Sequence, residues 1–175
     1  PSGLSAAIKF AQLNKKNNTN HSICVIEKGS EVGAHILSGN VFEPTALNEL
    51  IPDWKEKGAP LETPVKKDVV KYLINKNISI PIPFPGIFMP NFNNHGNYIM
   101  SLANFCRWLA KEAESLGVEI FPGFTASEVI IENDQLKGIV TGEMGIGKNG
   151  EKKPSYQPSM ELRAKYTVLS EGCRG

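Results

Sequence analysis

The sequence predicts an α/β fold built around a parallel sheet, and three observations predict it. The 175 residues are 41% hydrophobic, which is enough for one domain with a real core. Apolar residues recur at helical spacing over residues 3–16, and the continuous apolar run 23–26 follows after a polar turn. Because a helix followed by a strand buried on both faces is the second half of a βαβ unit, we expect a parallel sheet.

Composition and charge exclude several classes of protein. The chain carries 19 Lys+Arg against 18 Asp+Glu, a formal charge of +1, whereas a nucleic-acid binder normally has a clustered basic excess. Apolar residues are spread throughout, which argues against disorder, and none of the runs approaches the roughly 18 apolar residues of a spanning helix. Cys24, Cys106 and Cys173 are too far apart for a disulfide framework or a CxxC metal pair. We expect them to be reduced thiols in an intracellular setting.

In the first half of the chain, the pattern predicts these elements in order. The apolar face of the first helix consists of Leu4, Ala7, Ile8 and Ala11. Glu27 closes the strand that follows, a short helix is predicted over 45–50, and 53–67 is typical of a surface loop. Residues 69–82 can supply a strand or two, but their prolines keep them from a central position in a sheet.

The clearest helix is predicted over 98–116, with Asn97 as its N-cap and Gly117 after its last turn. Its apolar stripe consists of Ile99, Leu102, Phe105, Cys106, Leu109, Ala113 and Leu116. A strand is expected over 118–121.

The last third of the chain predicts further strands. Runs 129–132 and 136–141 are joined by a tight polar turn, which is typical of a hairpin. Residues 142–158 form a polar Gly/Lys-rich excursion, and 160–169 predicts another strand. Both the beginning and the end of the sequence indicate a fragment of a longer protein.

The N-terminus matches part of a nucleotide-binding fingerprint. Pro1, Ser2 and Gly3 fit the last three positions of G-x-G-x-x-G, whose first two glycines and strand would lie upstream. In that motif the pyrophosphate sits on a helix N-terminus, and the last glycine allows close packing of helix and strand. Glu27 ends the next strand at the distance expected for an acid that binds the ribose hydroxyls. Together these features predict dinucleotide binding.

A second phosphate-binding motif is judged to be a coincidence. Residues 142–148 spell GxxxxGK, but Asn149 replaces the Mg²⁺-binding Ser/Thr, and Pro154 stands where a helix should follow. We interpret the stretch as a hairpin loop. His21, His35 and His95 have no partner at metal-ligand spacing, so we expect no metal site. For His35, a cofactor contact and an ordinary loop hydrogen bond both remain open.

Several segments resemble one family in the same order along essentially the whole chain. They are EKG at 27–29, GAHILSG at 33–39, PDWKEKGAPL at 52–61, NNHGNY at 93–98, PGF at 122–124 and SEGCRG at 170–175. The chain resembles the electron transfer flavoprotein–ubiquinone oxidoreductases, and DWKEKGAPL and NNHGNY are specific to that family. It looks like their N-terminal FAD-domain portion.

The resemblance implies a truncated Rossmann-like FAD-binding domain of the glutathione-reductase type, with part of a quinone- and membrane-binding region. It implies an enzyme that takes electrons from reduced electron transfer flavoprotein through FAD and a [4Fe–4S] cluster to ubiquinone. The cluster ligands would lie outside this chain, which alone should be inactive. The expected location is a membrane surface: the matrix side of the mitochondrial inner membrane in a eukaryote, or the cytoplasmic membrane in a bacterium.

The resemblance also suggests roles for individual residues. Ser2 and Gly3 would face the pyrophosphate, and Glu27 the adenosine ribose with Lys28 beside it. The residues expected near the flavin, the adenine and the rest of the cofactor are Ser38, Gly39, Val129, Glu171 and Gly172. None is expected to be a catalytic acid or base, because the cofactor carries the chemistry.

The same resemblance divides the chain into residues 1–64 and 98–175, which bind FAD, and 65–97, which begin the quinone- and membrane-binding region. Within 78–92, apolar residues and prolines occur without charge. The residues expected to dock on one leaflet are Phe84, Ile87, Phe88 and Met89. A loop tucked against the core is the alternative.

Other functions stay open from the sequence. A soluble FAD-dependent reductase or monooxygenase-like flavoprotein would share the nucleotide motifs, and a non-catalytic FAD-binding or membrane-anchoring module would too. A nicotinamide dehydrogenase is less favoured, because the excursion between Glu27 and the strand at 118–121 does not suit a compact NAD domain.

Overall fold

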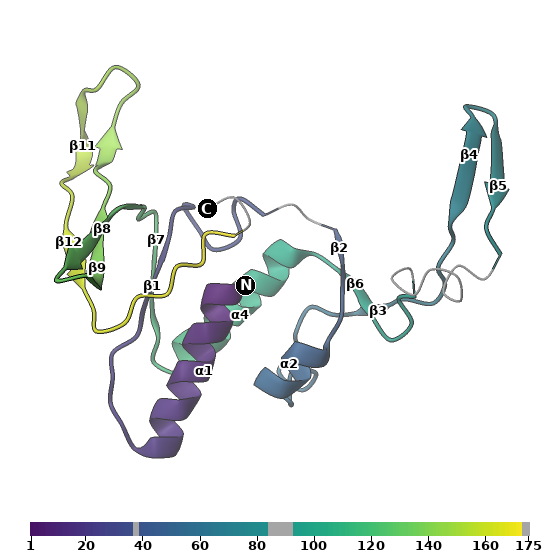
Figure 1. Cartoon of the computed structure of the whole chain (residues 1–175), viewed down its shortest axis with the longest axis horizontal. Coiled ribbons are helices and arrows are strands. Elements are labelled where there is room, and N and C mark those ends of the chain that lie inside the picture. The colour runs from purple at the N-terminus through teal and green to yellow at the C-terminus, as the bar shows by residue number, and fades with distance from the viewer. Residues whose placement is uncertain (37–38, 84–92, 173–175) are drawn as a thin grey trace. The chain divides into compact units, whose positions relative to one another are not determined.

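The computed structural model describes residues 1–36, 39–83 and 93–172, which fall into two compact units. The first unit comprises residues 1–35 and 106–175, and the second comprises residues 36–105. Figure 1 shows helices and short strands in both, so the chain is a mixed α/β protein. The predicted residues Ser38, Phe84, Ile87, Phe88 and Met89 lie outside the described residues.

The first unit contains the predicted helix–strand succession. Helix α1 (Ser2–Asn17) contacts strand β1 (Cys24–Glu27), and β1 pairs in parallel with β7 (Glu119–Pro122), so that Glu27 lies opposite Pro122. The expected apolar face of α1 is buried. Both the helix and the parallel pairing are thus confirmed.

The burial of β1 differs from expectation. The continuous apolar run predicted a strand covered on both faces, but Cys24 is exposed and the next three residues are half-buried. The physical reason is that β1 has one hydrogen-bonded neighbour, β7, within the described part of the chain. An edge strand keeps more of its surface in contact with water than a central one.

A three-stranded antiparallel sheet follows in the same unit, in the order β12–β9–β8. Strands β8 (Ala126–Glu132) and β9 (Gln135–Thr141) form the predicted hairpin, and Asn133 and Asp134 both have positive φ, as a two-residue type I′ turn requires. The strand expected over 160–169 is limited to β12 (Glu161–Arg163), because ladder pairing with β9 ends at Arg163. Tyr166, Val168 and Leu169 are exposed.

The GxxxxGK sequence lies in a second antiparallel hairpin, β10 (Met144–Ile146) with β11 (Lys152–Gln157). A strand, not a helix, follows the glycines, so the phosphate-cradle geometry is missing there. The interpretation of this stretch as a hairpin loop is confirmed.

The second unit contains an antiparallel sheet in the order β2–β6–β3, formed by β2 (Asn40–Phe42), β6 (Tyr98–Met100) and β3 (Thr63–Pro64). Helix α2 (Thr45–Leu50) has the predicted bounds. The apolar core of the second unit includes Leu47, Ile51, Trp54, Ala59, Leu61, Met100 and Phe105.

The prediction that residues 53–67 form a surface loop is therefore wrong in part, because some of these residues belong to the core. Trp54, Ala59 and Leu61 are buried. The Trp54 indole N–H donates to Asn48 Oδ1 at 2.7 Å, and its ring packs edge-on against Tyr98 with 5.7 Å between centroids. An aromatic anchor thus holds this charged stretch against the core.

Helix α4 (Leu102–Ser115) begins four residues later than predicted. Tyr98–Met100 belong to β6, where they pair with both β2 and β3, so non-local pairing overrides the helical spacing of Ile99. Asn97 is not the N-cap, and the Ser101 carbonyl accepts the first helical hydrogen bond, from the Phe105 N–H. Gly117, with φ of 87°, follows the last turn as expected.

The second unit also contains a hairpin of β4 (Lys71–Asn75) and β5 (Ile78–Pro81), which form a two-stranded sheet of their own (Figure 1). Every residue of both strands is exposed. Across the described ranges, none of the helices combines the length and apolar character needed to span a membrane.

Candidate cofactor-binding site

The first turn of α1 has the polarity that favours an anion. The helix is 16 residues long, its first turn contains no acidic residue, and no side chain caps it in the part of the chain that the structure describes. Ser2 is exposed as its first residue, followed by half-buried Gly3. First-turn N–H groups have no partner within a helix, and they lie at its positive end. Negative ligand oxygens are favoured there.

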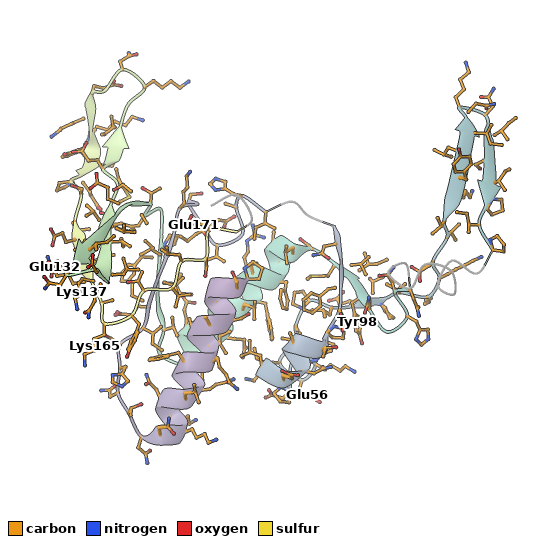
Figure 2. The ribbon with its side chains drawn as sticks, viewed as in Figure 1. Glu56, Tyr98, Glu132, Lys137, Lys165 and Glu171 are labelled. Carbon is orange, nitrogen blue, oxygen red and sulfur yellow. The ribbon has the colours of Figure 1, made fainter. Side chains whose placement is uncertain are left out.

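Gly3 allows another chain segment to approach this helix end. A Cβ atom at Gly3 would lie 3.3 Å from both Cβ and Oγ of Ser170, a contact tight enough to require movement. Ser170 immediately precedes Glu171 and Gly172, and Figure 2 labels Glu171 on the segment that follows β12. The structure therefore brings the predicted residues at both ends of the sequence to one place.

Glu27 stands at the carboxyl end of β1, where a buried glycine fixes its carboxylate. Its Oε1 accepts the N–H of Gly29 at 2.6 Å, and the Gly29 carbonyl accepts the N–H of Gly123 at 2.8 Å. A Cβ at Gly29 would lie 3.0 Å from the Glu31 carbonyl oxygen and 3.1 Å from Glu27 Oε1. A carboxylate has about four acceptor positions, so Glu27 keeps capacity for further donors.

An ion pair that the sequence did not suggest holds the same loop. Arg107 on α4 donates from its Nη2 to Glu31 Oε1 at 2.9 Å. The two residues are 76 positions apart, so no local pattern could have paired them. This contact and the Gly29–Gly123 hydrogen bond attach the loop after Glu27 to two other elements.

The remaining predicted residues are more dispersed. Lys28 is exposed beside Glu27. Val129 is exposed within β8 opposite Ile139, in a different sheet from Glu27. Gly39 belongs to the second unit and has a φ of 88°, a conformation that favours glycine.

The cysteine of β1 is not activated as a nucleophile. Although Cys24 is exposed as a residue, partial desolvation of its thiol raises the thiol pKa, and the nearby Glu119 carboxylate raises it further. The thiol is therefore protonated at neutral pH and is a poor nucleophile. The described residues contain no group of three or more His, Cys, Asp or Glu side chains arranged to hold a metal ion.

Sequence comparison identifies the relatives of this chain. Over its whole length it is 57% identical to an electron transfer flavoprotein–ubiquinone oxidoreductase of Pseudomonas aeruginosa, 53% to a mitochondrial one of Dictyostelium discoideum and 49% to one of Oryza sativa. The chain belongs to this family. It covers 32%, 28% and 29% of those relatives, so it spans less than a third of their length. The resemblance seen in the sequence is confirmed, although no protein-family model matches the chain.

Structure comparison supports the fold of the family member. THI4 of Thermovibrio ammonificans aligns with 95% of this chain and 52% of its own, with a TM-score of 0.52 and 18% identity. FqzB aligns with 79% of this chain and 30% of its own, with a TM-score of 0.52 and 16% identity. At these identities the likeness concerns the fold alone.

Proposed function

We propose that the protein to which this chain belongs is a flavoprotein oxidoreductase that passes electrons from reduced electron transfer flavoprotein through FAD and a [4Fe–4S] cluster to ubiquinone. The observation that carries this proposal is the 57% identity over the whole chain with a relative named for that activity. Residues 1–175 supply part of the FAD site, in a fold of the glutathione-reductase type. Since they span less than a third of the relatives' length, we expect them to be inactive alone.

The described residues fit an FAD. The anion-accepting end of α1, with Ser2 and Gly3, suits the pyrophosphate, and the Glu27 carboxylate suits the ribose hydroxyls with Lys28 beside it. The flavin supplies the redox chemistry, and the protein places it and sets its potential. Roles for Ser38, Gly39, Val129, Glu171 and Gly172 near the flavin and adenine are part of the same proposal.

Glu27→Gln in the full-length protein tests the ribose assignment. Glutamine keeps Oε1 as acceptor for the Gly29 N–H and removes the charge that strengthens hydrogen bonds from the ribose. Loss of that charge costs about 1.5–3 kcal/mol, so we expect FAD binding to weaken roughly 10- to 100-fold. Flavin absorbance per polypeptide and titration of the apoprotein measure this. The control is Glu114→Gln on an exposed turn of α4; unchanged affinity in Glu27→Gln rules out the assignment.

The β4–β5 hairpin supports a membrane role. Its exposed apolar side chains are Tyr72, Leu73, Ile74, Ile78 and Ile80. The lysines before and within it are Lys66, Lys67, Lys71 and Lys76. We propose that the β4–β5 hairpin, together with residues 84–92, docks on the surface of a bilayer. Its apolar side chains would enter the leaflet, and its lysines would lie at anionic headgroups. From here on, "the arm" denotes residues 69–82.

Co-sedimentation of the full-length protein with anionic vesicles tests docking. Tyr72 and Ile80 lie opposite each other in the β4–β5 ladder and so share one face. Each large apolar side chain that leaves water contributes about 1.5–3 kcal/mol, so Tyr72→Asp/Ile80→Asp should lower the bound fraction at least tenfold. Phe84→Asp/Phe88→Asp extends the test beyond the described arm, and Ile131→Asp is a matched control on an exposed position of β8. Flavin content should stay unchanged. If the arm variants lose flavin and melt early while wild type and variants bind vesicles equally, the segment is core and the docking proposal fails.

The iron content of the full-length protein separates this function from a soluble flavoprotein reductase. We expect four irons per flavin, bound by ligands outside residues 1–175. A flavoprotein without iron that ignores vesicles would favour the soluble alternative.

A further inference from the structure

Residues 63–75 change their hydrogen-bonding partner along their length. At the inner end, Pro64 lies opposite Tyr98, and the Val65 N–H donates to the Asn97 carbonyl at 2.8 Å. Beyond residue 68 the partner is another part of the chain. The Val70 carbonyl accepts the N–H of Ile82 at 2.9 Å, and the ladder of β4 with β5 follows.

Asp68 stands at this change of partner and binds Asn94 with both carboxylate oxygens. Oδ2 accepts the Asn94 backbone N–H at 3.0 Å, and Oδ1 accepts the Asn94 side-chain Nδ2 at 2.8 Å. Both residues are partly buried and lie 26 positions apart. The pair therefore joins the two ends of the segment that contains the arm.

Further bonds connect Asn94 to the sheet of the second unit. Its carbonyl accepts the Asn97 N–H at 3.0 Å, and its Oδ1 accepts Asn97 Nδ2 at 3.3 Å. Asn97 in turn precedes Tyr98 in β6 and receives the Val65 N–H. A continuous set of hydrogen bonds thus runs from the β3–β6 pairing to Asp68.

We propose that Asp68 is a positioning residue: through Asn94 it fixes the base of the arm, so that the apolar side chains of β4 and β5 meet the lipid surface together. This inference rests on the proposed docking function. An isolated two-stranded hairpin is marginally stable in water, and all residues of these strands are exposed. The direction of the arm therefore depends on its base.

Charge and geometry make separable predictions for Asp68. Removing its negative charge close to Lys66 and Lys67 would by itself strengthen attraction to anionic lipid. Loss of the two Asp68–Asn94 hydrogen bonds would instead weaken vesicle binding, because the base of the arm would no longer be fixed. A fall in vesicle binding after Asp68→Ala would therefore oppose the change in charge and point to position.

The experiment uses full-length holoprotein and vesicles of phosphatidylcholine with phosphatidylglycerol. We expect Asp68→Ala to lower the apparent affinity about tenfold, because both hydrogen bonds from Asn94 to the Asp68 carboxylate are lost. In Asp68→Asn/Asn94→Asp the donor and acceptor exchange places, so binding should return to within about twofold of wild type. Glu62→Gln, a nearby exposed carboxylate, is the matched control. Flavin content and melting temperature are measured for each variant.

The outcomes separate this inference from the docking proposal. If wild type does not bind vesicles, docking fails and the role of Asp68 fails with it. If wild type binds and Asp68→Ala binds equally well, docking stands and the positioning role is overturned. Loss of flavin or an early melting transition in Asp68→Ala, or absence of rescue in the exchanged pair, shows a general structural role and also overturns it.

Discussion

The two hairpins β8–β9 and β4–β5 resemble each other in sequence and differ in what they bury. Both are rich in β-branched residues, and both contain apolar pairs across the strands, Val129 with Ile139 and Tyr72 with Ile80. In the first, however, Ile139 is 7% exposed and Thr141 is 1% exposed. In the second every residue is exposed, and Ile80 is 52% exposed.

The difference follows from the number of neighbours. Strand β9 lies between β8 and β12, and Thr141 exchanges backbone and side-chain hydrogen bonds with Met160 at 2.8 and 2.9 Å. Each strand of the arm has one neighbour in the described part of the second unit. Composition alone therefore does not decide which apolar strand is core. A hairpin that keeps large apolar side chains in water calls for a binding partner.

Matched truncations give the largest expected effect. Ile139→Ala should cost about 2–5 kcal/mol of local stability, because it removes buried atoms and leaves a cavity. Ile80→Ala should change stability by less than about 0.5 kcal/mol, because its side chain is half in water. Hydrogen exchange of peptides from β9 and β5 in the full-length protein measures both. An equal loss of local stability in Ile139→Ala and Ile80→Ala would show that the arm is packed as tightly as β9.

The turns of the two hairpins give a smaller effect. In the arm, Asn75 Oδ1 accepts the N–H groups of Asn77 at 2.9 Å and Ile78 at 3.0 Å, closing the turn with a side chain. Asn75→Ala should weaken the arm by about 1 kcal/mol, seen as faster exchange in 71–81 with no change in β8–β9. Asn75→Asp keeps an acceptor and is the control. Equal exchange in Asn75→Ala and Asn75→Asp would show that this acceptor does not close the turn.

What the sequence could predict is largely what local chemistry decides. The apolar face of α1, the bounds of α2 and the hairpin of β8 with β9 depend on residues within a few positions, and all were predicted, although Gln135 belongs to β9 and not to the turn. The start of α4 was not, because Tyr98 pairs with Phe42 and Pro64, which are distant in sequence.

The candidate site shows the same division between local and distant contacts. Glu27 and its loop were visible as a motif. The contacts that hold the loop and the arm were not: Arg107 with Glu31, and Asp68 with Asn94, are 76 and 26 residues apart. The burial of Trp54 in a charged loop likewise follows from its contacts with Asn48 and Tyr98.

The smallest expected effect is the response of the arm to acid. Hydrogen bonds from the Asn94 side chain and backbone hold the pKa of the Asp68 carboxyl below its ordinary value of 3.8. A group whose pKa is lowered by folding stabilises the folded form fully above its ordinary pKa, and this contribution is lost as the pH falls through the lowered value. The base of the arm should therefore be insensitive to pH between 7 and about 4 and should loosen below that.

The variant Tyr72→Trp, whose fluorescence is measured by acrylamide quenching in the full-length protein, reports this change. We compare the reporter variant that keeps Asp68 with the same variant carrying Asp68→Ala. The difference in quenching between the two should stay constant from pH 7 to about 4 and vanish in stronger acid. The reason is that protonated Asp68 loses the acceptor that binds Asn94. The same scan on Glu62→Gln corrects for other carboxylates. A difference that disappears near neutral pH would contradict the lowered pKa, whereas no difference at any pH would show that the arm does not depend on Asp68.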